Sequence, residues 1–287
     1  MVVRTFIATL ALLAAGQSAV ALAAAEPPSL VAMRVGGKAG AIDDPNAAHW
    51  AKAQALKIVM QAQSVVAPQN LEPSVAELSV RAAHNGQWIA FLIEWADPTK
   101  SDRIVVDRFG DQVAVELPVN YEKDAPPNVM MGQPDGGRVT IMQWRAAFQR
   151  DLDEGEQSIE DLYPFTHVDI YPDEVLRASD ARAYMGSVGV DNPIGHPKRV
   201  PVLDQMAEGW GTLTVKPEQN ASGKGVWQDG RWRVLIARPM ATDNNEYDPR
   251  LAPGDQTVAA FAVWEGGNAE VGGRKAWSDW VDLAIGK

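Results

Sequence analysis

Apolar and polar residues alternate with a period of two along most of the chain, in short runs that end at turn residues. The stretch AELSVRAAHNGQWIAFLIEWAD (76–97) predicts two strands joined at Asn85-Gly86, a dipeptide that favours tight hairpins. A second hairpin is predicted for GVWQDGRWRVLIARPM (225–240), which turns at Asp229-Gly230. Further strands are predicted for DQVAVELPV (111–119), RVTIMQWRA (138–146), GWGTLTVKP (209–217), QTVAAFAVWEGG (256–267) and WSDWVDLAIG (277–286).

Helical patterns are few. They are confined to residues 46–55, 145–153, 157–162 and 173–182. The region from about 150 to 205 is rich in proline and is expected to be mostly loop. Short strands with few helices predict a mainly β protein, an antiparallel β-sandwich with a few short helices and loop insertions. No internal repeat or linker is visible, so residues 26–287 are expected to form a single domain.

The first 25 residues resemble a secretory signal. They contain Arg4, an apolar run from Phe6 to Leu12 and small residues at Ala21–Ala25, where cleavage is expected. A membrane anchor is the alternative, but Gly16-Gln17-Ser18 interrupt the run before it reaches the roughly 18 apolar residues of a membrane span. We therefore expect an exported, periplasmic protein without a membrane span.

Charge and cysteine usage narrow the function. The chain has 26 basic and 37 acidic side chains, a formal net charge of −11, which argues against nucleic-acid binding and suits a basic partner. It has no cysteine, which excludes disulfides, cysteine-ligated zinc or iron–sulfur clusters, and covalent c-type haem.

Other sites have weak support in the sequence. No G-x-S-x-G nucleophile motif or calcium-loop pattern is present, and the acidic run DLDEGEQSIEDL (151–162) is typical of a solvated surface. The histidines lack metal-ligand spacing: His49, His84, His167 and His196. Five of the ten tryptophans fall in strand patterns, where they indicate either core packing or stacking on a flat ligand: Trp88, Trp95, Trp227, Trp232 and Trp264.

A methionine doublet, Met130-Met131, lies in the loop PPNVMMGQPDGG (126–137). Methionine commonly fills gaps in a core, and core packing remains open for this pair. A thioether held by a rigid loop is also a suitable axial ligand for haem iron. The residues alone leave both interpretations open.

Several stretches in order resemble the haem-binding gamma subunits of ethylbenzene dehydrogenase and of related periplasmic molybdenum enzymes, such as dimethyl sulfide dehydrogenase. They are AAHNGQWIAFLIEWADPT, FGDQVAVELPV, PPNVMMGQPDGGRVTIMQWRA, DNPIGHPKRVPVLDQMAEGWGTLT, GVWQDGRWRVLIARPM and FAVWEGGNAEVGGRKAWSDWVDL. Together they cover nearly all of the chain after residue 25, although the long acidic middle and the glycine-rich loop near the end depart from the family pattern.

The resemblance implies a non-covalent haem b between the two sheets, with iron bound by a methionine and a lysine. Here these would be Met131, with Met130 as a competitor, and Lys275 of GGRKAWSDW, with Lys198 and Lys224 as alternatives. The lysine would have to be deprotonated, which requires burial. By position we place further residues around the cofactor: Trp144, Tyr184 and Trp210 as walls, and Arg145 and Arg199 as propionate partners.

The resemblance further implies that the chain itself is not an enzyme. It would relay electrons between the iron–sulfur beta subunit of a complex, whose molybdopterin-containing alpha subunit performs the catalysis, and a soluble c-type cytochrome. Two alternatives remain. A secreted carbohydrate-binding β-sandwich module would use the tryptophans and acidic loops, and a hydrolase would use carboxylates between 151 and 174.

Overall fold

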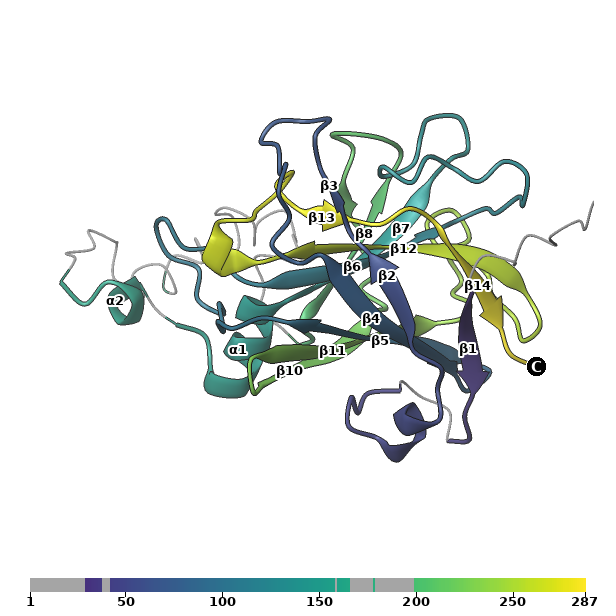
Figure 1. Ribbon diagram of the computed structural model, residues 1–287, viewed down its shortest axis with the longest axis horizontal. Coiled ribbons are helices and arrows are strands. Elements are labelled where there is room, and N and C mark those ends of the chain that lie inside the picture. Colours follow the sequence, from purple (N-terminus) through teal and green to yellow (C-terminus); the bar gives the residue numbers. More distant parts are fainter. Residues whose placement is uncertain (1–28, 38–41, 158, 166–177, 179–198) are drawn as a thin grey trace, which may run out of the picture.

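The computed structural model describes residues 29–37, 42–157, 159–165, 178 and 199–287 (Figure 1). The strands are β1 (Leu30–Arg34), β2 (Leu56–Val59), β3 (Gln61–Ala62), β4 (Glu77–His84), β5 (Trp88–Ala96), β6 (Gln112–Pro118), β7 (Val139–Arg145), β8 (Val202–Ala207), β9 (Thr214–Val215), β10 (Ser222–Gln228), β11 (Arg231–Pro239), β12 (Gln256–Trp264), β13 (Ala276–Trp277) and β14 (Val281–Ile285). The helices are α1 (Ala146–Glu154) and α2 (Ile159–Leu162), with 3-10 turns η1 (Ala48–Ala51) and η4 (Gly266–Asn268).

The strands form two layers that share one strand (Figure 1). Sheet A has the order β10-β11-β5-β4-β1-β14-β12, with β2 also paired to β4. Sheet B continues from β12 through β6, β7 and β8 to β9, with β13 and β3 on its other side. Residues Gln256–Ala259 of β12 pair with β14, and Ala260–Trp264 pair with β6, so β12 passes from one sheet to the other. All pairings are antiparallel except those of β1, which is parallel to both neighbours.

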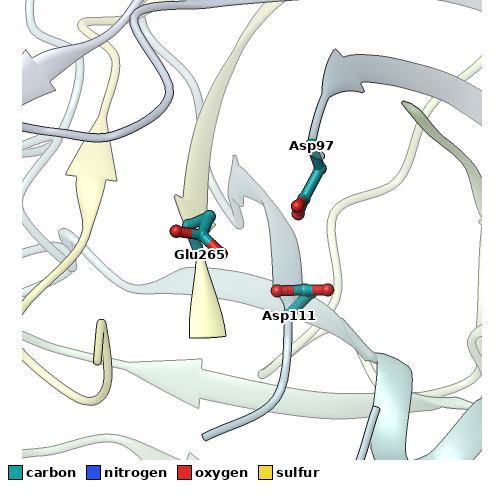
Figure 2. Close-up of side chains that lie close together, drawn as sticks. All are labelled: Asp97, Asp111 and Glu265. Atoms are coloured by element: carbon teal, nitrogen blue, oxygen red, sulfur yellow. The ribbon is translucent and has the colours of Figure 1, made fainter. Parts of the chain in front are cut away.

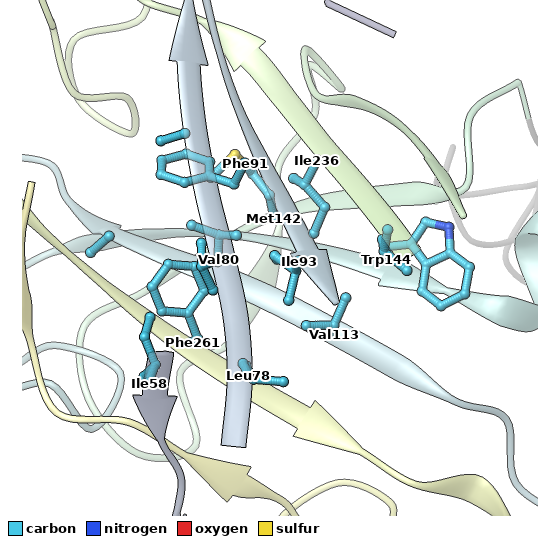
Figure 3. Packing of buried hydrophobic residues seen from close by; sticks show 14 of the residues in the cluster. Ile58, Leu78, Val80, Phe91, Ile93, Val113, Met142, Trp144, Ile236 and Phe261 are labelled. Atoms are coloured by element: carbon cyan, nitrogen blue, oxygen red, sulfur yellow. The ribbon is translucent and has the colours of Figure 1, made fainter. Parts of the chain in front are cut away.

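The main core lies between the two sheets. Phe91 of sheet A meets Phe261 of sheet B with ring centroids 6.2 Å apart and planes at 72°, a favourable edge-to-face contact (Figure 3). At one end of the core, Trp144 packs edge-on against Trp232 at 4.9 Å. Burial of each such aromatic side chain contributes on the order of 2–3 kcal/mol, so this layer supplies much of the stability.

The close approach of the sheets explains one glycine. A Cβ added to Gly225 of β10 would lie 2.1 Å from the indole ring of Trp144. Only a residue without a side chain therefore fits where Trp144 enters the core.

The sequence predictions are confirmed for the fold class and for most strands. Both hairpins form at the predicted turns, and β6, β7, β12 and β14 lie within the predicted stretches. Trp95 and Trp232 are core residues, exposed by 1% and 2%. The helix predicted at 145–153 is present as α1, and α2 lies inside the stretch 157–162.

Other predictions are corrected. The helix expected at 46–55 is only the 3-10 turn η1, and GWGTLTVKP forms just the two-residue strand β9. The sequence prediction placed β8 in a loop because the strand lacks alternation: five of its six residues are buried, including Asp204. The signal at 1–25, the helix at 173–182 except residue 178, Tyr184 and Lys198 lie outside the described residues.

Candidate functional site

A pocket lies on the outer face of sheet B, opposite the main core. Val113 and Val115 of β6 point into the core, so Ala114 and Glu116 point outward. On the neighbouring strand β12, Ala262 pairs with Ala114 and Ala260 pairs with Glu116. These small side chains leave room above the sheet. The residues that line the pocket are Gln63, Ala114, Glu116, Val129, Met130, Met131, Ile141, Trp210, Ala260, Phe261, Ala262, Trp264, Lys275, Trp277 and Ser278.

One wall of the pocket is the methionine loop, residues 126–137. Asn128 fixes its turn, because its side-chain oxygen accepts the Met130 N–H at 2.8 Å and its carbonyl accepts the Gly132 N–H at 2.8 Å. The loop base is held by Trp280, whose Nε1 donates to the Pro127 carbonyl at 2.8 Å. Met131 has φ +69°, an uncommon value for a side chain with a Cβ. The loop is therefore held in one shape by hydrogen bonds around Met131.

Gly132 is required by this shape. Its φ is +76°, and a Cβ there would lie 2.4 Å from the Gly137 carbonyl oxygen. The same carbonyl accepts the Gln133 N–H at 3.0 Å, which closes the loop on itself. The glycine after the methionine pair thus allows the two arms of the loop to touch.

Another part of the wall is Lys275, the last residue of the lysine loop, residues 265–275. Trp264 Nε1 donates to the Gly272 carbonyl at 3.0 Å, and Gln63 Nε2 donates to the Gly273 carbonyl at 2.7 Å. Lys275 directly precedes β13, and its Nζ lies 5.3 Å from the ring centroid of Trp264 and 5.9 Å from that of Trp210. The amine therefore lies beside two indole rings.

The pocket's two ionisable groups disfavour their charged forms. Burial lowers the pKa of Lys275, and the attraction of Glu116 only partly opposes this. Burial raises the pKa of Glu116 to about 8, against the effects of Lys275 and of the Met131 N–H that donates to its carboxylate. Among the described residues, no salt-bridge or hydrogen-bond partner reaches Lys275 Nζ, and Glu116 Oε1 also lacks a hydrogen-bond partner. Burial therefore favours the uncharged amine, which is the form of lysine that can bind a metal.

Four of the proposed site residues meet in this pocket: Met130, Met131, Trp210 and Lys275. Of the alternative lysines, Lys224 lies exposed on β10 in sheet A, away from the pocket. Of the two candidate lysines that the structure describes, Lys275 is the one that lines the pocket.

The other proposed residues lie elsewhere. Trp144 is fully buried in the main core, and its Nε1 donates to Gln149. Arg145 is on the outer face of sheet B, in the cross-strand row Trp264–Gln112–Arg145, and does not line the pocket. Arg199 is exposed and also outside the pocket.

The pocket also differs in position from what the resemblance implies. The expected ligand site is between the sheets, whereas that space is filled by the main core, and Met131 packs on the separate outer cluster formed by residues such as Ala114, Ile141 and Trp264. Sequence reasoning missed Glu116, because a carboxylate in an alternating strand is typical of a solvent-facing position. The neighbouring alanines could have indicated that Glu116 lies in a pocket, because their side chains are too small to cover the sheet: Ala114, Ala260 and Ala262.

Comparison with known proteins gives a consistent family. A family model described as ethylbenzene dehydrogenase matches residues 47–276. The chain is 25% identical over 244 residues to a protein of Haloferax mediterranei named as a respiratory nitrate reductase heme subunit, ORF7, covering 84% of this chain and 68% of that protein. It is 23% identical over 257 residues to dimethylsulfide dehydrogenase subunit gamma of Rhodovulum sulfidophilum, covering 83% and 74%.

Among solved structures, the chain is similar to a family 9 carbohydrate-binding module from Caldicellulosiruptor kristjanssonii in complex with glucose. The TM-score is 0.44 at 9% identity, with 91% of this chain and 97% of the module covered. Among the described residues, none of the helices is long and apolar enough to cross a membrane.

Proposed function

The chain belongs to the ethylbenzene dehydrogenase family, and on that premise we propose that it is a haem b-binding gamma subunit that transfers electrons for a molybdenum enzyme complex. Relatives named as a heme subunit and as a subunit gamma support this assignment. The main support for this function is that Met131 and Lys275 line the same pocket, although 143 residues lie between them in the sequence.

The donor set fits an iron porphyrin. A thioether and an uncharged amine are ligands for haem iron, whereas Mg²⁺ and Ca²⁺ prefer carboxylate and carbonyl oxygens. Trp210 and Trp264 provide flat apolar walls, and the alanines of β6 and β12 provide a smooth floor. Met131 and Lys275 would hold the iron, with Met130 as the neighbouring alternative.

The pocket must widen to admit a porphyrin, because its present cavity of about 50 Å³ is much smaller than that ligand. Trp210 is the wall best placed to move. It is 37% exposed and lies between Gly209 and Gly211, both with positive φ. Rotation of the Trp210 side chain would uncover the floor, while Gly209 stays bound to the methionine loop through its N–H, which donates to the Met131 carbonyl at 2.6 Å.

The two ligands determine the type of chemistry. Haem iron supplies one-electron chemistry when bound. Met131 would favour the reduced metal, and Lys275, a harder donor, would moderate that preference. Because Met131 and Lys275 would both hold the iron, the chemistry that the group would supply here is electron transfer. Catalysis would then take place on a partner subunit with molybdopterin.

Glu116 positions both walls. Its carboxyl accepts the Met131 N–H and faces the Lys275 amine. Since the pKa of Glu116 is raised to about 8, the carboxyl is largely protonated near pH 7 and does not hold the lysine in its ammonium form. Burial therefore leaves the amine free to bind a metal.

The proposal extends to partners and location. We place the chain in the periplasm, where it would pass electrons between an iron–sulfur beta subunit and a soluble c-type cytochrome. The net charge of −11 suits association with a basic protein, because opposite charges speed encounter.

The test is a visible spectrum of the purified chain, with haem added if the preparation is colourless. We expect a red protein with a sharp low-spin haem spectrum. Met131→Ala and Lys275→Ala should each lose haem or change the spectrum and the redox potential. Met130→Ala and Lys224→Ala serve as matched controls and should be mild. A chain that stays colourless after haem addition overturns the proposal, and a stronger effect of Met130→Ala than of Met131→Ala would transfer the ligand role.

A further inference from the structure

Three carboxylates that do not line the pocket converge at the ends of strands of both sheets (Figure 2). Asp97 follows β5, Asp111 precedes β6 and Glu265 follows β12, so both sheets contribute. One oxygen from each of the three lies within 4.8 Å of the others. Asp97 and Asp111 are fully buried, and Glu265 is partly buried.

The surrounding chain supplies hydrogen-bond donors but no cation. Asp111 accepts the Gly266 N–H at 2.9 Å through Oδ1, and the Ser101 N–H at 2.8 Å and Trp232 Nε1 at 2.9 Å through Oδ2. Within the described part of the chain, no lysine, arginine or histidine forms a salt bridge with the three carboxylates. Burying several carboxylates together without a compensating charge is costly.

A separate observation indicates a ligand. Asp97 is 0% exposed, yet its Oδ2 has no hydrogen-bond partner of good geometry; the Trp95 indole, whose Nε1 also lacks such a partner, is the donor that acts on this carboxyl. Figure 2 shows its carboxylate directed toward Asp111 and the space beside Glu265. Its other oxygen, Oδ1, accepts the Thr99 N–H at 3.0 Å, so the side chain is held in this orientation. A buried acceptor aimed at two other carboxylates is the arrangement expected of a metal ligand.

Burial also perturbs the titration of the three groups. The pKa of Asp111 is raised to about 7, chiefly by burial and then by repulsion from Asp97, and burial raises the pKa values of Asp97 and Glu265 as well. A positive ion among them would remove this repulsion.

We propose that Asp97, Asp111 and Glu265 bind one calcium ion that links sheet A to sheet B. All the donors are oxygens, which calcium prefers. Calcium–oxygen distances are about 2.4 Å, so oxygens on opposite sides of one ion are about 4.8 Å apart, as the observed grouping allows. The Thr99 hydroxyl is 3.2 Å from oxygens of both Asp97 and Glu265 and is placed to join the shell with water.

The ion would act as a clamp. Trp232 of β11 and Gly266 of η4 already contact Asp111, so four segments meet at the site. The packing there is tight: a Cβ on Gly266 would lie 2.1 Å from the Phe109 carbonyl oxygen. Calcium should therefore stabilise the fold.

The experiment uses the purified full chain, treated with EDTA and exchanged into metal-free buffer. Calcium chloride alone is then added, with binding followed by calorimetry and the unfolding temperature measured in parallel. We expect saturable binding with a stoichiometry near one and a rise in Tm of about 5 °C at 100 times the Kd. Asp97→Asn and Glu265→Gln should weaken binding by at least about 10-fold.

The matched control is Glu122→Gln, an exposed carboxylate outside the cluster, which should bind calcium as the unaltered chain does. If Asp97→Asn does not fold, Glu265→Gln decides by the same criterion. The proposal is overturned if the unaltered chain shows no saturable binding up to millimolar calcium, which would mean that the carboxylates share protons instead. It is equally overturned if the foldable variants keep full affinity.

Discussion

Substitution of Gly132 by alanine tests whether the methionine loop is held by close backbone contact. The new Cβ has two costs. The φ of +76° strains a residue with a side chain by about 1–2 kcal/mol. In addition, the Cβ would lie 2.4 Å from the Gly137 carbonyl and 3.2 Å from that of Ala207, and these are backbone atoms that cannot simply rotate away.

Gly136→Ala is the matched control in the same loop. Gly136 also has positive φ, +99°, but nothing lies within 4 Å of its added Cβ. Its cost should be the strain alone. Gly132→Ala adds an overpacking cost of about 1–3 kcal/mol and disturbs the Gln133–Gly137 hydrogen bond, worth about 1 kcal/mol. We therefore expect Gly132→Ala to be more destabilising by roughly 2–4 kcal/mol.

The assay is urea unfolding of both variants without haem, followed by circular dichroism and by tryptophan fluorescence. Coincident transitions would justify a two-state fit. Gly132→Ala should also weaken haem binding more than Gly136→Ala, since it displaces Met131. Equal stabilities of the two variants would refute the contact argument, because strain alone would then account for the loop.

Two other expectations concern buried charge. The amine of Lys216, a residue that is 2% exposed, lies 2.7 Å from a carboxylate oxygen of Asp204 and 2.7 Å from one of Asp248. Lys216→Met removes this amine from two buried carboxylates and should lower the free energy of unfolding in urea by about 3–5 kcal/mol, whereas Lys57→Met, at an exposed ion pair, should lower it by no more than about 1 kcal/mol. Similar losses in the two variants would contradict this expectation. Burial lowers the pKa of His84, so its contribution to stability is complete above pH 6.5 and is lost as pH falls through the lower folded pKa. The drop in unfolding free energy on acidification should therefore be smaller in His84→Gln, and an unchanged pH profile would rule out this role.

The pattern of apolar and polar residues predicted strands correctly where one face of the strand is polar or where a strong turn signal ends the strand. The Asn85-Gly86 turn and the alternation around it predicted the strands β4 and β5 correctly. The same logic failed at β8, because Asp204 is buried by its pairing with Lys216 and the strand has no exposed face to mark it. The ion pair is a property of the folded chain that alternation alone does not reveal.

The candidate site was predictable only in part, and for a similar reason. Met131 and Lys275 came from resemblance to a family, since neither residue is distinctive in its own segment. Glu116 resembles a surface residue until the loops that cover it are in place. The three carboxylates of the proposed calcium site come from the ends of three strands, so only the pairing of β6 with β12 and the packing of the sheets bring them together.

The separation of the two hydrophobic clusters bears on how these sites can be tested. The main core between the sheets contains Phe91, Phe261 and Trp144, whereas Met131 packs on the smaller outer cluster. Loss of the Met131 side chain therefore leaves the inter-sheet contacts intact, and a change in the haem spectrum would report on ligation and not on unfolding. The calcium cluster is different, because Asp111 binds Trp232 of the main core. Its substitutions are expected to change stability and ion binding together, which is why the decisive comparison there is calcium affinity in a folded variant.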